Sequence, residues 1–162
     1  MASFDPEATV RILNKHGVRY VVIGGMAAQL HDLPVPATVD IDVTPAHDRK
    51  NLEFLADAFD ELEAGLYSVD EGATWFPRRP VENWAQYANL HLMTKFGPVD
   101  IVFRPDGAAN GFADVLRNAE KSMLGEEPVL VIATATWVAL KQAAGRQKDI
   151  EHLDQYFQHL ES

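Results

Sequence analysis

Apolar residues follow two different periods along the chain, and together these predict an α/β fold. The run from Val18 to Ile23 is nearly continuous and rich in β-branched residues, which suits a buried central strand. Further on, large apolar residues recur every three or four positions, which predicts a helix packed on the sheet and ended by Gly65: Leu52, Leu55, Phe59 and Leu62. Strands alternating with helices are typical of α/β proteins.

Local signals mark where several elements begin. Asp5-Pro6 supplies the preferred N-cap and first residue of a helix, with Gly17 as its expected stop. Thr44-Pro45 repeats this pattern and predicts the start of the helix that carries the apolar stripe. Two runs, Leu90–Thr94 and Val99–Phe103, flank a turn-forming segment and predict a β-hairpin.

The last third of the chain is predicted to form a short helix at 110–118, strands at 121–124 and 129–132, and two helices. Thr134 or Thr136 is expected to cap the first of these two, which ends at Gly145. The second, from about Lys148 to Leu160, carries one apolar face that is expected to dock on the domain: Ile150, Leu153, Phe157 and Leu160.

The segment from Gly65 to Tyr87 has no clear period. It contains Trp75 and Trp84 and the pair Arg78-Arg79. Aromatic residues interleaved with arginines can stack a base and hold a phosphate. The alternative is a proline-bounded surface loop with both tryptophans packed inward.

Two acids and two glycines form the candidate functional core. Asp40 and Asp42 are two residues apart, so on a strand both side chains face the same way. Paired carboxylates beside apolar residues are costly unless a cation lies between them. Gly24-Gly25 follows the first strand and opens a short helix, where a backbone without Cβ atoms can approach a phosphate. This combination predicts metal-assisted chemistry on a nucleotide.

Asp100 adds a third acid, between Val99 and Ile101 in a strand where an apolar residue is expected. Such an acid needs a partner or a metal ion. The alternative is an exposed acid on an edge strand. The six histidines show no metal-ligand spacing, and we interpret them as structural or surface residues.

Composition narrows the possible partners. The 162 residues suit one domain, predicted to span 1–162 with a core at about 1–105 and an extension at about 106–162. The net charge of −10 disfavours a broad nucleic-acid surface and favours small nucleotides or a basic protein partner. The chain has no cysteine, no apolar run of membrane-spanning length and no signal-peptide pattern, so we expect a cytoplasmic protein without membrane contact.

The glycine pair followed by an Asp-x-Asp strand resembles the nucleotidyltransferase fold of the polymerase-beta type. Thr38-Val39-Asp40-Ile41-Asp42 is similar to the Thr-x-Asp-Ile-Asp of AbiEii-like proteins, which include toxins of toxin–antitoxin pairs. A second similarity covers Trp137–Lys141 and Ala144–Asp149, like the Lys…Gly-Arg-x-Lys-Asp segment of that branch. One position departs from it: Pro36 stands where these proteins usually have a basic residue.

The resemblance implies a mixed sheet flanked by helices, with the C-terminal helices packed on the domain. It implies a metal-dependent nucleotidyltransferase whose catalytic and metal-binding residues, holding two Mg²⁺ ions, are Asp40, Asp42 and Asp100. It also implies a nucleoside triphosphate bound by six residues: Gly24, Gly25, Thr38, Lys141, Arg146 and Lys148.

Several alternatives stay open at this point. Lys141 also fits a plain helix C-terminus, where a cation is favoured, and Asp149 could simply pair with Arg146 or Lys148. The acceptor could be RNA, protein or a small molecule, and an antitoxin could be the protein's partner. The rival hypothesis is a non-catalytic module on the same fold that binds a nucleotide or a partner.

Overall fold

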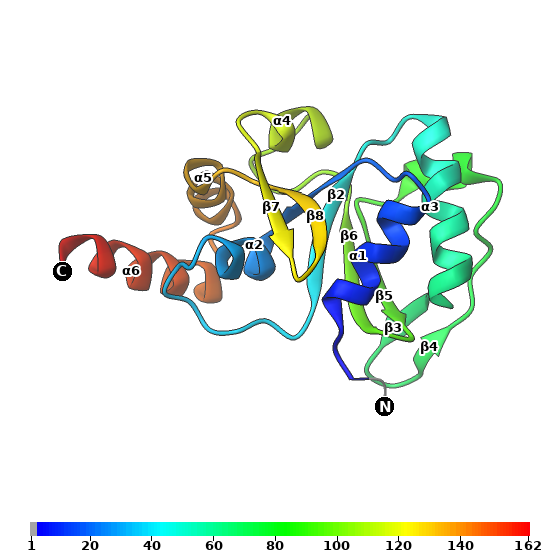
Figure 1. Cartoon of the computed structure of the whole chain (residues 1–162), viewed down its shortest axis with the longest axis horizontal. Helices are drawn as coiled ribbons and strands as arrows, with labels where there is room; N and C mark the ends of the chain where they lie inside the picture. The colour runs from blue at the N-terminus through cyan, green and yellow to red at the C-terminus, as the bar shows by residue number, and fades with distance from the viewer. Residues whose placement is uncertain (1–2) are drawn as a thin grey trace.

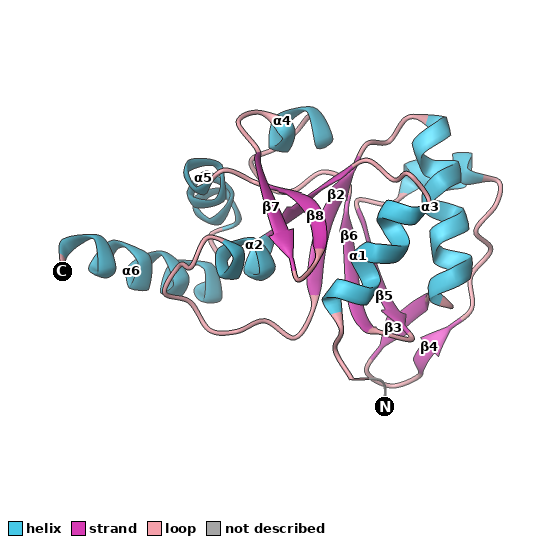
Figure 2. Ribbon diagram, in the orientation of Figure 1, coloured by secondary structure: helices cyan, strands magenta, loops and turns pink. Residues whose placement is uncertain are grey.

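The computed structural model describes residues 3–162, apart from the side chain of Ala85. Its centre is one eight-stranded mixed sheet of order β4-β3-β5-β6-β2-β1-β8-β7 (Figures 1 and 2). The strands are β1 (Tyr20–Ile23), β2 (Ile41–Pro45), β3 (Gly65–Ser68), β4 (Gly72–Thr74), β5 (Asn89–Thr94), β6 (Gly97–Val102), β7 (Glu120–Leu124) and β8 (Glu127–Val131). The predicted α/β class and mixed sheet are therefore confirmed.

Helices surround this sheet. They are α1 (Pro6–Lys15), α2 (Gly24–Leu30), α3 (Arg49–Leu62), the 3-10 helix η1 (Val81–Gln86), α4 (Phe112–Leu116), α5 (Thr134–Ala144) and α6 (Gln147–Glu161). The helices α1 and α3 lie side by side against the sheet, and α5 contacts both α2 and α6 (Figure 1). None of the helices in the described residues is both long and apolar enough to span a bilayer.

The middle of the sheet determines where the acids meet. β2 runs antiparallel to β1 and parallel to β6. In this register Asp42 lies beside Ile23 on one side and beside Asp100 on the other. Residues paired across neighbouring strands project to the same face, so the two acids are brought together although 58 positions separate them in sequence.

Helix α1 forms as its local sequence predicts. The Asp5 side chain accepts a hydrogen bond of 3.1 Å from the Ala8 amide, and Pro6 is the first helical residue. The apolar face of the helix, which includes Val10 and Leu13, is buried in the core. At its end, Gly17 adopts a positive φ of 73°.

The predicted helix start at Thr44-Pro45 is wrong. Strand β2 continues through Pro45, because Thr44 and Pro45 pair with β1 and are buried. The pairing of β2 with β6 ends at Val43, so Pro45 has β1 on one side and no paired strand on the other, an edge position where proline is tolerated. The cap of α3 is instead Asp48, whose side chain accepts from the Asn51 amide at 3.2 Å. The helix ends at Leu62, before the predicted stop at Gly65.

Two details of the C-terminal helices also differ from the prediction. Neither threonine caps α5, because Ala133 is its N-cap and Thr134 is already its first residue. The helix does end at Gly145, which has a φ of +61°. On α6, Leu153 is buried, but Phe157 and Leu160 are 41% and 61% exposed, so much of the expected docking face is uncovered. The helix extends away from the body of the molecule (Figure 1).

The segment from Gly65 to Tyr87, which has no clear hydrophobic period, contains strands β3 and β4 and the helix η1. Trp84 is buried as the packing interpretation predicts, but Trp75 is 72% exposed. The arginines make local contacts. Arg78 donates to the carbonyls of Phe59 and Ala64, and Arg79 pairs with two acids of α3.

Candidate active site

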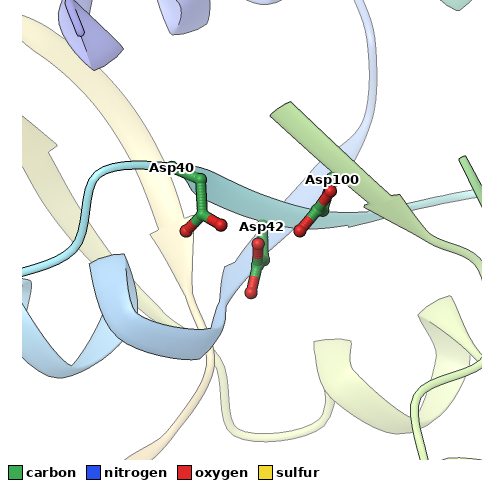
Figure 3. Close-up of side chains that lie close together, drawn as sticks. All are labelled: Asp40, Asp42 and Asp100. Carbon is green, nitrogen blue, oxygen red and sulfur yellow. The ribbon is translucent and has the colours of Figure 1, made fainter. Parts of the chain in front are cut away.

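Three carboxylates converge on one face of the paired strands β2 and β6 (Figure 3). Asp42 projects from β2 and Asp100 from β6, while Asp40 lies in the bend directly before β2. One ligand oxygen of each acid lies within 4.8 Å of those of the other two, and all three side chains are partly buried. The expectation that Asp100 joins the Asp40–Asp42 pair agrees with this geometry.

The Asp42 carboxylate is largely buried and is repelled by the two neighbouring acids. Its Oδ1 is buried and has no hydrogen-bond partner among the described residues. Burial, together with the charges of Asp40 and Asp100, raises the pKa of Asp42 to about 8. A divalent cation among the three carboxylates would satisfy the orphaned oxygen and offset this repulsion. The donor set is entirely carboxylate oxygen, which suits a hard ion such as Mg²⁺.

The glycine pair leaves room for the acids. Gly24 has a φ of +65°, and a Cβ atom there would fall against the Asp42 carboxylate. A Cβ on Gly25 would lie 3.0 Å from the Cβ of Thr38. Trp137 fixes this turn from α5, since its indole N–H donates to the Gly24 carbonyl at 3.2 Å. Glycine is therefore required at position 24 by both backbone conformation and space.

Thr38 holds the Asp40 carboxylate. Its hydroxyl donates to Asp40 Oδ1 at 2.7 Å, and its own amide donates to Gln29 Oε1 at 2.6 Å. The second bond attaches the loop before β2 to α2. Thr38 thus orients one of the three acids, a role different from the nucleotide contact that the resemblance implies.

His91 is a site residue that the sequence analysis missed. Its Nδ1 contacts Asp100 Oδ1, and its ring meets the edge of Tyr67 at 5.1 Å between centroids. The predicted hairpin had its turn at 95–98, a register that does not pair positions 91 and 100. The observed turn is only two residues, 95–96, because Gly97 and Pro98 already pair with β5, and this register brings His91 beside Asp100. No spacing of histidines along the chain would have revealed it.

A buried ion-pair network forms where α5 meets α6. Asp149 is fully buried, and its oxygens accept from Lys141 Nζ at 3.1 Å and from Arg146 Nε at 2.8 Å. Burial alone would raise the pKa of Asp149, but the hydrogen bonds from Arg146 and Lys141 lower it below its usual value. Lys141 also donates to His152 Nδ1 at 3.1 Å. The structural alternative for Asp149, pairing with Arg146, is therefore observed.

Two other cations line the same pocket and are not held in ion pairs in the described part of the chain. Lys148 and Arg104 are exposed, and within residues 3–162 neither has a carboxylate at ion-pair distance. The positive charge of Lys148 lowers the pKa of Asp42 and so offsets part of the increase caused by burial and by the other two acids. Arg104, which the sequence analysis also missed, follows Asp100 by four positions along β6 and its extension.

The three acids, His91 and the cations described above line one pocket of about 740 Å³. Each of the nine predicted site residues is on its wall: Gly24, Gly25, Thr38, Asp40, Asp42, Asp100, Lys141, Arg146 and Lys148. Acids from β2, from the bend before it and from β6 line this pocket together with cations from α5, α6 and the turn between them. Pro36 lines it too, whereas Trp75, Arg78 and Arg79 do not. The pocket is large enough for a nucleotide.

Comparison with known proteins identifies the fold. No protein-family model matches the chain, and no curated protein matches it. The structure is similar to a crystal structure of Thermotoga maritima TM1012, a protein whose assignment as a nucleotidyltransferase is provisional. The TM-score is 0.53 at 17% sequence identity, and the similarity covers 98% of this chain and 97% of the other. At this identity the match supports the nucleotidyltransferase fold and gives no information about the substrate.

Proposed function

We propose that this protein is a metal-dependent nucleotidyltransferase, which moves a nucleoside monophosphate from a triphosphate to an acceptor hydroxyl. The observation that carries the proposal is the convergence of Asp40, Asp42 and Asp100 around an orphaned buried oxygen. A protein that bound no cation there would gain stability by losing these carboxylates. The nucleotidyltransferase fold supports the same conclusion.

The three carboxylates would hold Mg²⁺, and two ions are expected. When bound, such ions lower the pKa of an acceptor hydroxyl and neutralise phosphate charge. Thr38 keeps Asp40 in position for this role. Asp100 would orient the acceptor hydroxyl and take its proton. The hydroxyl oxygen forms the new bond to the α-phosphorus, and the bond to pyrophosphate breaks in line.

The cations that line the pocket suit the leaving group. Lys148 has no ion-pair partner in residues 3–162, and Arg146 is 72% exposed in its side chain, so both can reach phosphate oxygens. Lys141 is buried and held by Asp149 and His152, so we assign it a positioning role at the α5–α6 junction. Backbone N–H groups at Gly24 and Gly25 would complete the phosphate contacts.

The resemblance to AbiEii-like proteins extends the proposal to a toxin of a toxin–antitoxin pair, acting on RNA or protein and neutralised by an antitoxin. The net charge of −10 points instead to a small acceptor. Pro36, on the pocket wall, replaces a cation that would help to bind RNA or a triphosphate.

Transfer of label from each of the four nucleoside triphosphates, with Mg²⁺, tests the proposal on total RNA, total protein and a small-molecule extract. The Asp40→Asn/Asp42→Asn protein is the blank. Label on one class of acceptor, absent from the blank, would support nucleotidyl transfer and identify the acceptor. Folded protein that transfers no label above the blank would favour the rival, a non-catalytic binding module.

A further inference from the structure

A second pocket, of about 310 Å³, lies apart from the acid cluster, between α3, η1 and the end of β6. Its wall is apolar and largely aromatic: Leu52, Val81, Trp84, Tyr87 and Phe103. Four of these five are among the buried residues of the core, and Tyr87 is half-buried. The pocket is therefore set into a packed region of the molecule and has a size suited to one small ring system.

Trp84, which lines this pocket, is packed into the core with its polar atom unpaired. The residue is only 2% exposed, and its indole N–H has no hydrogen-bond partner among the described residues. Phe59 packs beside the indole, with 5.4 Å between ring centroids. A buried donor without a partner is costly, and tryptophan N–H groups usually find an acceptor. The nitrogen itself is buried, so a ligand in the pocket would contact the aromatic wall and not this N–H.

The rim of the pocket is positively charged. Arg49 is paired with Glu82 at 3.2 Å, so those two charges balance. Arg104 has no carboxylate at ion-pair distance within residues 3–162, and His47 adds a further polar group. A local positive charge on a protein of net charge −10 favours a small anion over a neutral ligand.

We propose that this pocket binds a small aromatic anion, with its ring against Trp84 and its carboxylate or phosphate at Arg104. Aromatic walls favour a planar ring by stacking, and the guanidinium of arginine matches either anionic group with two parallel N–H donors. The volume excludes a long polymer from the pocket itself.

Arg104 also lines the acid pocket, and it follows Asp100 by four positions along the chain. A ligand held by Arg104 would therefore lie next to the acceptor side of the proposed reaction. This consequence, unlike the binding itself, rests on the proposed function: the acceptor would be a small molecule that carries an aromatic ring and an anionic group.

The binding is measured without metal or nucleotide, so that its outcome does not depend on transfer activity. The probes are indole-3-carboxylate and phenyl phosphate, with indole-3-carboxamide as the neutral control. The chain has three tryptophans, and their indole N–H signals in a ¹H–¹⁵N spectrum locate the ligand. The Trp84→Phe protein identifies the Trp84 signal. Arg104→Gln removes the proposed anion contact, and Arg117→Gln, at an exposed arginine that lines neither pocket, is the matched control.

A saturable shift of the Trp84 signal is expected with at least one anionic probe, and which one binds distinguishes a carboxylate site from a phosphate site. Affinity should fall about tenfold in Arg104→Gln or with the carboxamide, and should not change in Arg117→Gln. No saturable shift at millimolar probe, a shift confined to exposed Trp75, or equal losses in both arginine variants would overturn the proposal.

Discussion

At the scale of single residues, Asp42 couples stability to pH. Its pKa is raised from 3.8 to about 8 in the folded protein. Between these values the folded state binds more protons than the unfolded state, so the free energy of unfolding falls as pH rises. The stabilising contribution is complete below pH 3.8 and is lost as the pH passes 8.

We therefore expect chelator-treated protein to be less stable at pH 8 than at pH 6 in denaturant titrations. Asp42→Asn, which cannot ionise, should remove most of this pH dependence. Addition of Mg²⁺ at pH 8 should restore stability to the original protein and not to the variant. An identical pH slope in both proteins would show that Asp42 is not the group responsible.

His91 leads to a second prediction at this scale. Because its ring contacts Asp100, His91→Ala should leave that carboxylate free to turn away from Asp42. Outer contacts of this kind typically change metal affinity about 10- to 100-fold. Calorimetric titration with Mn²⁺ should show this loss, with partial recovery in His91→Asn, whose amide can replace Nδ1. His159→Ala, at an exposed histidine of α6, is the control, and equal affinities in all four proteins would refute the role.

At the scale of elements, Asp149 joins two helices. It accepts from the Arg146 amide at the start of α6 and from Lys141 on α5, and it is fully buried. Asp149→Ala should lower the free energy of unfolding by about 3 kcal/mol, because it leaves Lys141 buried without its charge partner. Asp154→Ala, at an exposed acid of the same helix, should change it by less than about 0.5 kcal/mol.

Denaturant titration at pH 7 measures both variants. The folded-state pKa of Asp149 is lowered, so its contribution is present above pH 3.8 and is lost as pH falls below that value. The difference between Asp149→Ala and the original protein should therefore shrink in acid. A constant difference down to pH 2 would contradict the ion-pair explanation.

Elements defined by local signals could be predicted from the sequence. The cap and proline at Asp5-Pro6 form as expected. The predicted hairpin also forms, but its turn is 95–96 and not 95–98, because Gly97 and Pro98 belong to β6. The same cap–proline signal failed at Thr44-Pro45, because pairing with β1 extends the strand through those residues. On α6, periodicity identified an apolar face but could not show that only Leu153 would be covered.

At the scale of the whole molecule, the topology assembles the candidate site from distant segments. The parallel pairing of β2 with β6 brings Asp42 beside Asp100, and α5 and α6 bring their cations to the same pocket. The sequence could identify the acids because carboxylates in apolar strands are unusual, whereas it identified the cations only through the family resemblance. It could not reveal that Lys141 is buried against Asp149, or that Arg104 lines the wall, because both depend on how separate elements pack.

The central claim is that Asp40, Asp42 and Asp100 form a metal-binding nucleotide site. Anomalous diffraction from crystals grown with Mn²⁺ and a non-hydrolysable nucleoside triphosphate tests it most directly, since Mn²⁺ accepts the same oxygen ligands as Mg²⁺. We predict anomalous peaks about 2.1 Å from oxygens of the three carboxylates, with the triphosphate reaching Lys148. Ordered side chains without a peak between them, at saturating Mn²⁺, would contradict the account.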